Sequence, residues 1–256
     1  MKRVVFNQKG GVGKSTIVCN LAAIGAARGR SVAVVDLDPQ SNSTQYLLGE
    51  DWAQDETNIG AFFENTLAFR GNPDPADYVV ETPFRDLWIL PASRQLTDLE
   101  TKLESRHKIY KLREALDALL GDVDEIWVDT PPALNFFTYS ALIGADRCLI
   151  PFDCDDFSRR ALYQLLENVE EVREDHNPDL SVEGIVVNQF QPRSRLPQRL
   201  VQELIDEGHP VLEPMLSSSV IVKESHQAAK PLVHLSPKHK VAVQFQELYD
   251  TLTAKA

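Results

Sequence analysis

Short apolar runs along the chain alternate with longer stretches that are compatible with helices. The run at residues 4–6 and the β-branched run at 31–35 predict buried strands, and the Ala/Ile/Leu-rich stretch at 15–27 predicts a helix between them. A third run, at 125–128, predicts another strand. Strands alternating with helices predict an α/β fold with one mostly parallel, twisted sheet and helices on both faces. Later strands are expected at 87–90, 147–151, 184–188 and 211–215, and later helices at 108–120, 158–174, 196–207 and 238–252.

No internal repeat, low-complexity tract or domain boundary interrupts this pattern. The polar stretch at 51–77 is interpreted as a helix followed by a surface loop. At 256 residues and 43% hydrophobic content, the chain can bury a full α/β core. We therefore expect residues 1–256 to form one domain.

A glycine-rich sequence, Asn-Gln-Lys-Gly-Gly-Val-Gly-Lys-Ser-Thr, occupies residues 7–16, between the first predicted strand and the first predicted helix. Successive backbone N–H groups at such a turn form a concave nest, and the helix dipole adds positive potential, so the turn suits a polyphosphate. Gly10, Gly11 and Gly13 permit backbone angles and a close ligand approach that a Cβ would block. Together with Val12 they are the expected nucleotide-binding loop.

The residues after the glycines carry the expected polar contacts. Lys14 is expected to reach the β- and γ-phosphates, Ser15 to ligate Mg²⁺, and Thr16 to donate to the α-phosphate. The usual pattern G-x-x-x-x-G-K-[ST] fails at its first position, where the chain has Gln8. A second lysine, Lys9, lies five positions before Lys14. Taken alone, Lys9 is as well explained as a solvated surface lysine.

Three carboxylates lie at the ends of predicted strands. Asp36 and Asp38 follow the run at 31–35 and share one side of an extended chain, because side chains repeat every two residues. Asp129 ends the run at 125–128, directly before Thr-Pro-Pro. Open α/β sheets bind ligands at the carboxyl ends of their strands. Each Asp taken singly could instead cap a following helix, but three acids beside a phosphate loop indicate a magnesium–nucleotide site.

The loop Lys9-Gly10-Gly11-Val12-Gly13-Lys14-Ser15 resembles the deviant Walker A loop of the ParA/MinD family of P-loop ATPases. The segment from Asp36 to Gln40 is similar to the family's Asp-x-Asp-Pro-Gln motif, and 128–132 to its Walker B motif. The resemblance implies ATP and Mg²⁺ as cofactors. It also implies that Asp38 orients the attacking water, while Asp36 and Asp129 serve the magnesium shell.

The resemblance further implies a homodimer that closes on ATP, in which Lys9 crosses the interface to the partner's ATP and acts as an arginine finger does. Asn188, at the end of the predicted strand 184–188, would contact adenine. An asparagine that caps a turn at the edge of the core is the alternative for Asn188.

Cysteine content and hydropathy exclude several classes of protein. The three cysteines, Cys19, Cys148 and Cys154, suit neither a disulfide scaffold nor a metal site. No signal peptide and no apolar run near 18 residues is found, so we expect a cytoplasmic protein. The last segment, 241–256, has Glu247 and Asp250 against only Lys255, which argues against membrane binding by a basic helix.

By resemblance to ParA proteins, a DNA partner is expected, with non-specific binding to the nucleoid and release after hydrolysis. The net charge of −12 opposes this, but residues 184–256 hold 8 Lys/Arg and 7 Asp/Glu, so that part of the chain is close to neutral. The segment 216–220, Leu-Ser-Ser-Ser-Val, replaces an Ile-Pro-Arg that touches DNA in many relatives. A solvated basic edge is the alternative interpretation. The candidate DNA contacts are Arg193, Arg195, Arg199, Lys223 and Lys230.

The expected function is an ATP-dependent switch that positions a plasmid, a chromosome or a protein assembly, together with a ParB-like or cargo-adaptor protein. Two alternatives belong to other classes. One is a nucleotide-gated interaction protein that never binds DNA, which the acidic charge supports. The other is a small-molecule ATP-dependent ligase or synthase of the same loop family, against which Lys9 and the Asp-Pro-Gln motif argue.

Overall fold

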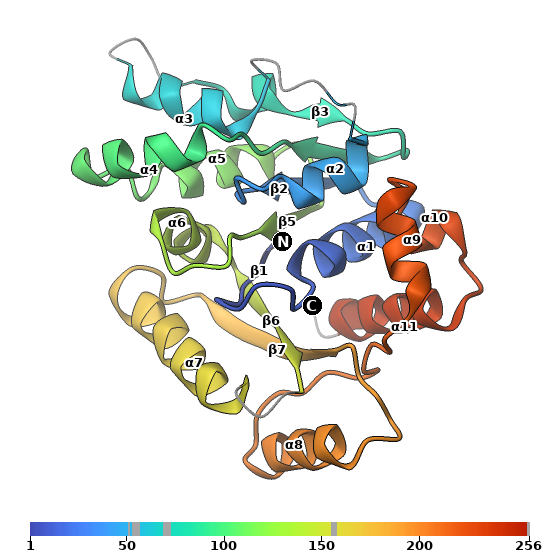
Figure 1. The fold of residues 1–256 in the computed structure, drawn as a ribbon. Coiled ribbons are helices and arrows are strands. Elements are labelled where there is room, and N and C mark those ends of the chain that lie inside the picture. Colours follow the sequence, from blue (N-terminus) through green and yellow to red (C-terminus); the bar gives the residue numbers. More distant parts are fainter. Residues whose placement is uncertain (51, 53–56, 69–72, 155–157, 255–256) are drawn as a thin grey trace.

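The computed structural model describes residues 1–50, 52, 57–68, 73–154 and 158–254. Its centre is a seven-stranded sheet in the order β3-β4-β2-β5-β1-β6-β7 (Figure 1). β3 pairs antiparallel with β4, and the other pairs are parallel. The strands are β1 (Lys2–Val5), β2 (Val32–Asp36), β3 (Val80–Glu81), β4 (Leu87–Leu90), β5 (Glu125–Asp129), β6 (Arg147–Asp153) and β7 (Ser181–Asn188).

Helices cover both faces of the sheet, as the alternating pattern predicts (Figure 1). The helices are α1 (Lys14–Ala27), α2 (Asn42–Leu48), α3 (Ile59–Leu67), α4 (Leu96–Ser105), α5 (Lys111–Leu119), α6 (Phe136–Gly144), α7 (Ser158–Asp175), α8 (Arg195–Asp206), α9 (Val220–Gln227), α10 (Leu232–Leu235) and α11 (Lys240–Ala254), with a 3₁₀ turn η1 (Pro75–Tyr78). One hydrophobic cluster packs α3 to α7 on one face, and a second packs α1, α2, α10 and α11 on the other. The predicted fold class is confirmed.

The central strands are buried on both faces, which explains the apolar runs at residues 4–5, 32–35 and 126–128 within them. Every residue of β1, β2 and β5 is buried. A parallel strand between two helical layers must be apolar on both sides, so it lacks the alternation of a half-exposed strand. The polar residues at the ends of these strands are therefore exceptions to the pattern.

The predicted strand at 211–215 is wrong. Val211 forms only an isolated bridge with Ile185, and the chain then continues irregularly beside β7. Leu212 N donates to the carbonyl of Ile185 and Leu216 N to that of Val187. Pro210 and Pro214 flank the bridge and have no N–H to donate, which prevents a regular ladder.

Several other elements depart from the sequence-based assignment. Helices α2, α4, α9 and α10 and the short β3 are additional to it. Within the polar stretch 51–77 the structure has α3 and the beginning of η1, whereas 51, 53–56 and 69–72 lie outside the described residues. In the described part of the chain, no helix is long and apolar enough to cross a membrane.

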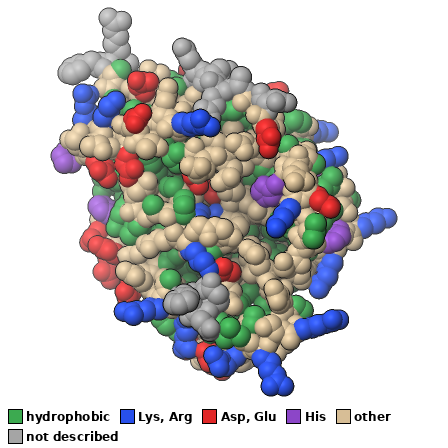
Figure 2. Space-filling view, in the orientation of Figure 1, with side chains coloured by type: hydrophobic (Ala, Val, Ile, Leu, Met, Phe, Trp, Pro, Cys, Tyr) green, Lys and Arg blue, Asp and Glu red, His purple; other side chains and the backbone are tan. Residues whose placement is uncertain are grey.

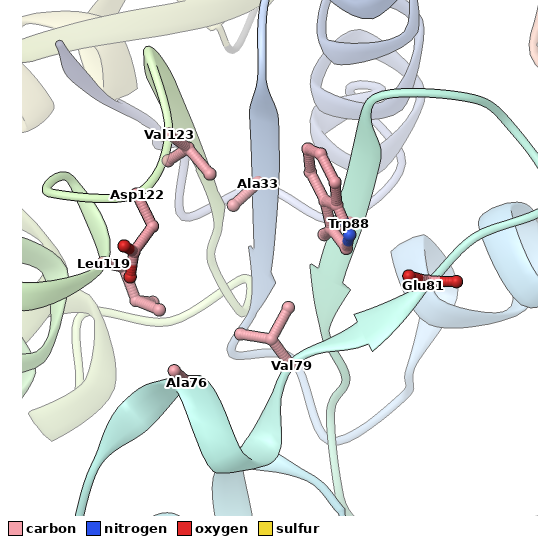
Figure 3. Close-up of a pocket in the computed structure, with 8 residues that line it drawn as sticks. All are labelled: Ala33, Ala76, Val79, Glu81, Trp88, Leu119, Asp122 and Val123. Atoms are coloured by element: carbon pink, nitrogen blue, oxygen red, sulfur yellow. The ribbon is translucent and has the colours of Figure 1, made fainter.

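A cavity of about 330 Å³ lies near the amino ends of β2 and β4, beside η1 and the end of α5 (Figure 3). Ala33, Val79, Trp88 and Val123 form most of its apolar wall, with Glu81 at its side. Because ligand sites of open α/β sheets form at the carboxyl ends of the strands, this cavity is separate from the phosphate loop.

Candidate nucleotide-binding site

The glycine-rich loop connects β1 to α1 and is held from the far edge of the sheet. Gly13 has φ +94°, and a Cβ there would lie 2.3 Å from Asn188 Nδ2. Asn188 Nδ2 donates to the carbonyl of Val12 at 2.8 Å, and Gln189 Nε2 to that of Gly11 at 3.1 Å. The Val12 side chain is fully buried. The end of β7 therefore fixes the loop, and any side chain at position 13 would be strained and would displace Asn188.

Lys14 is buried and points back into the loop. Its Nζ donates to the carbonyls of Asn7 at 3.0 Å and Lys9 at 3.3 Å. Burial lowers the pKa of Lys14, while the charges of Asp129 and Asp38 oppose that shift. An ammonium held by neutral carbonyls can exchange them for the oxygens of a polyphosphate, which are stronger acceptors.

Asp36 and Asp129 are adjacent across the β2–β5 pair, and both are fully buried. Asp36 Oδ2 accepts from Thr44 N at 2.9 Å and from Thr44 Oγ1 at 2.8 Å. Asp129 Oδ2 accepts from Ser43 Oγ at 2.7 Å, whereas Oδ1 is buried without a hydrogen-bond partner. The unpartnered oxygen beside a second carboxylate fits a hydrated Mg²⁺.

Burial raises the pKa of both acids. Burial, and then the neighbouring charge of Asp129, raise the pKa of Asp36 well above its usual range. Burial raises the pKa of Asp129 to about 6, and hydrogen bonds from Ser15 and Ser43 limit the rise. Two carboxylates this close cannot both ionise cheaply without a cation.

Asp38 lies two residues after Asp36 and lines a cavity beside the phosphate loop. Its N–H donates to Asp36 Oδ1 at 3.1 Å, and its own Oδ1 accepts from Gln40 N at 2.9 Å. Burial raises the pKa of Asp38. Its place on the cavity wall suits a group that binds a water molecule beside the phosphates.

Two adjoining cavities follow the loop. One, of about 370 Å³, is lined by Gly10, Gly11, Gly13, Lys14, Ser15, Thr16, Asp38, Gln40, Asn42, Pro132 and His226. The other, of about 170 Å³, is lined by Gly11, Gly13, Thr16, Asn188, Gln189, Ser217, Ser218, Ser219, Val222, Lys223, Val241 and Phe245. They share Gly11, Gly13 and Thr16, so the phosphate cavity continues into a second compartment beside Asn188.

Comparison with known proteins agrees with this geometry. A family model described as an AAA domain matches residues 2–182. The chromosome partitioning protein ParA of Myxococcus xanthus is 34% identical over 242 residues, covering 92% of this chain and 82% of that protein. The sporulation initiation inhibitor protein Soj of Bacillus subtilis is 30% identical, covering 98% and 97%.

The chain belongs to the ParA/MinD family of P-loop ATPases. It is accordingly an ATPase that uses ATP and Mg²⁺. Among solved structures, cobyrinic acid a,c-diamide synthase from Mycobacterium smegmatis with bound ADP and magnesium is 28% identical with a TM-score of 0.84, covering 98% of this chain and 93% of that chain.

The lysine that distinguishes the ParA/MinD loop is tied to the end of β6. Lys9 Nζ forms an ion pair with Asp153 Oδ2 at 2.7 Å, and the two side chains are 39% and 24% exposed. Lys9 N–H donates to Asn7 Oδ1 at 2.9 Å. The ammonium of Lys9 therefore points to the rim of the site, whereas that of Lys14 is inside it.

The five predicted DNA contacts are exposed but do not form one cluster. Arg193 precedes α8, and Arg195 and Arg199 lie one turn apart on it. Figure 2 shows Lys and Arg side chains along the edge of the molecule over α8. Arg199 Nε lies 3.6 Å from Glu203 Oε1, so the basic face of α8 is partly neutralised. Lys223 lines the cavity beside Asn188, and Lys230 follows α9.

Some residues of the site were not singled out from the sequence. His226, Gln189 and Ser217–Ser219 reach the nucleotide cavities from the last third of the chain. Ser43 and Thr44 hold the buried acids from α2. The available signal for Ser43 and Thr44 was their position just after the Asp-Pro-Gln motif.

Proposed function

We propose that this single-domain ATPase is a dimerising switch that hydrolyses ATP slowly and positions or segregates a cargo. The cargo is a chromosome, a plasmid or a protein assembly, and a ParB-like or cargo-adaptor protein stimulates the ATPase. The chromosome partitioning protein ParA of Myxococcus xanthus, which matches 92% of the chain, supports this proposal. The observation that carries it is the position of Lys9, at the rim of the site and 39% exposed, beside a complete phosphate loop.

In the proposed reaction, the position of each residue in the site determines its role. Gly10, Gly11, Val12 and Gly13 supply backbone donors, and Lys14 binds the β- and γ-phosphates. Ser15, Asp36 and Asp129 hold magnesium, which when bound offsets the charge of the phosphates. Asp38 orients the attacking water, and Thr16 and Asn188 bind the nucleoside side. Lys9 completes the site only in a second copy, so hydrolysis requires the dimer.

Sedimentation of the purified chain tests dimerisation. We expect a monomer with ADP and Mg²⁺ and a dimer with a slowly hydrolysed ATP analogue and Mg²⁺. The same oligomer with both nucleotides would overturn the switch. Stimulated turnover without a change of assembly would favour the alternative below.

We propose further that the ATP-bound dimer binds DNA without sequence preference and so associates with the nucleoid. The support is the near-neutral C-terminal part of the chain and the exposed Arg193, Arg195 and Arg199 at α8. Affinity from phosphate contacts falls steeply with salt. A gel shift with random duplex DNA and ATP at 50 and 200 mM salt tests it, and absence of an ATP-dependent shift at both salts would refute DNA binding.

A matched pair of variants localises the DNA surface. Arg195→Glu should weaken the gel shift and leave ATP-driven dimerisation intact. Arg85→Glu makes the same charge change between β3 and β4, at the opposite edge of the sheet, where Arg85 is 93% exposed. The gel shift of DNA by Arg85→Glu should equal that of the unmodified chain. Equal losses in both variants would show a general charge effect instead of a contact at α8.

A second candidate function is ATP-dependent ligation of a small molecule. It is favoured by the 28% identity and near-complete overlap with a structure described as a cobyrinic acid a,c-diamide synthase. Such an enzyme would activate a carboxylate of a small substrate at the phosphate cavity. Turnover that rises only with a small carboxylic acid and a nitrogen donor would support this candidate.

A further inference from the structure

His226 is a polar side chain of the nucleotide site that the P-loop motifs do not include. It lies on α9, 210 residues after Thr16, and lines the phosphate cavity. Its Nε2 lies 2.8 Å from the hydroxyl oxygen of Thr16. Its ring stacks on Tyr46 of α2, with ring centroids 3.8 Å apart and an interplanar angle of 18°. The imidazole is thus fixed between the first turn of α1 and α2.

The surrounding hydrogen bonds keep α9 in this place. Tyr46 Oη and Ser225 Oγ are 2.8 Å apart, and Asn20 Nδ2 donates to Tyr46 Oη at 3.1 Å. Asn20 Oδ1 in turn accepts from Leu232 N at 2.8 Å. Figure 1 shows α9 beside α1 and α2, as these contacts require. Helices α1, α2, α9 and α10 therefore meet at one polar cluster next to the phosphate loop.

The number of protons in the Thr16–His226 pair limits what it can do. A threonine hydroxyl has one proton to donate and accepts through its oxygen lone pairs. Burial lowers the pKa of His226, so the ring is neutral and carries one proton. If Thr16 donates to Nε2, its only proton faces away from the phosphates. If Nε2 donates to Thr16, the hydroxyl proton can point into the cavity.

We propose that His226 is a nucleotide-positioning residue that donates its Nε2 proton to Thr16 and so directs the Thr16 hydroxyl proton to the α-phosphate. The stack on Tyr46 holds the ring in the orientation that this requires. The inference rests on nucleotide binding at the P-loop and not on DNA binding or cargo.

The binding of ADP with Mg²⁺, measured by titration calorimetry, tests the proposal in two variants of similar side-chain size. The amide of His226→Gln can still donate to Thr16, whereas His226→Met cannot, and both lose the aromatic stack. We expect His226→Gln to bind ADP within about twofold of the unmodified chain and His226→Met about fivefold more weakly. Equal affinities in the two variants would overturn the proposal.

A double-mutant cycle then shows whether His226 acts through Thr16. In a Thr16→Val background there is no hydroxyl to orient, so His226→Met should cause no further loss of ADP affinity. A second loss of about fivefold there would contradict the proposed route. A change in packing alone would not depend on the Thr16 hydroxyl. It would therefore lower the melting temperature equally in the Thr16 and Thr16→Val backgrounds.

His234 supplies a matched control in the same chain. It lies on α10 and stacks on Phe84, with centroids 4.7 Å apart and an interplanar angle of 11°, and it does not line either nucleotide cavity. His234→Met should bind ADP as the unmodified chain does. A loss equal to that of His226→Met would overturn the assignment to His226. Absence of ADP binding in the unmodified chain would instead refute the nucleotide site itself.

Discussion

Replacing Asp129 with asparagine removes a buried charge that only a cation makes favourable. Its pKa is raised from the usual 3.8 to about 6 by burial, and its Oδ1 has no hydrogen-bond partner. One pKa unit corresponds to about 1.4 kcal/mol, so ionised Asp129 costs the magnesium-free fold about 3 kcal/mol at neutral pH. Asp129→Asn keeps the acceptor for Ser43 and removes this cost. We therefore expect the magnesium-free variant to be more stable than the unmodified chain.

The sign of the pH dependence follows from the raised pKa. A carboxyl whose folded pKa exceeds its unfolded pKa binds the proton more tightly in the folded state, so folding stability falls as pH rises. For Asp129 the fall occurs between about pH 4 and pH 6. Below pH 4 the side chain is neutral in both states. The advantage of the asparagine variant should therefore vanish there.

Thermal unfolding without and with Mg²⁺–ADP measures these effects. At pH 7.5 without Mg²⁺ the melting temperature of Asp129→Asn should rise by about 6–12 °C, because about 1 kcal/mol corresponds to about 2–4 °C in a chain of this size. With Mg²⁺–ADP the unmodified chain should gain stability through ligand binding, and the variant should gain much less. A lower melting temperature of the magnesium-free variant at pH 7.5 would refute the reasoning.

Asp36→Asn is the matched control. It makes the same substitution on the neighbouring strand β2, where the carboxylate has different hydrogen-bond partners. Both oxygens of Asp36 accept hydrogen bonds, from Thr44 and from Asp38 N. An asparagine NH₂ there would face at least one N–H or O–H donor. We expect Asp36→Asn to gain less folding stability than Asp129→Asn, because the lost hydrogen bonds, about 1–3 kcal/mol, offset the relief of a buried carboxyl whose pKa is also raised. Equal stabilisation by both substitutions would show that the hydrogen-bond partners do not matter.

Other substitutions test the remaining parts of the site. Lys14→Ala should abolish ATP binding in a calorimetric titration, and retained affinity would contradict the loop assignment. Lys9→Ala should still bind ATP but lose stimulated hydrolysis; losing the partly exposed pair with Asp153 should change stability by less than about 1 kcal/mol. Gly13→Ala should reduce both stability and ADP affinity, because its Cβ would overlap Asn188 Nδ2. Asp38→Ala should accumulate an ATP-bound dimer in sedimentation, and normal turnover would assign water orientation to another residue.

The P-loop and the strand-end acids could be predicted because their positions follow from local rules. A buried parallel strand must be apolar on both faces, so the polar residue that ends it is conspicuous in sequence. Asp36 and Asp129 end β2 and β5, and the strand register makes them direct neighbours. That the side chains of Asp36 and Asp129 lie close together follows from their positions at the carboxyl ends of two strands in one sheet. Which carboxylate oxygen lacks a partner depends on Ser43 and Thr44, and only the structure shows that.

The C-terminal part of the site was harder to predict because its contacts are long-range. Helix α9 has eight residues, and Val220 at its start is 70% exposed, so no clear apolar stripe marks it. The partner of His226 is 210 positions away in sequence. The apolar segment 211–215 resembles a strand, but Pro210 before it and Pro214 within it limit it to one bridge. Periodicity does not encode which distant segment a short irregular piece packs against.

The contacts of the loop also show how nucleotide binding can reach the proposed DNA surface. Asn188 and Gln189 donate to the carbonyls of Val12 and Gly11, so the loop backbone is joined directly to the end of β7. The chain continues from there through Arg193 into α8. Lys14, which a phosphate would draw away, holds the carbonyls of Asn7 and Lys9 at the beginning of the same loop. The hydrogen bonds of Asn188 and Gln189 therefore link the phosphate loop to the segment that leads through Arg193 into α8.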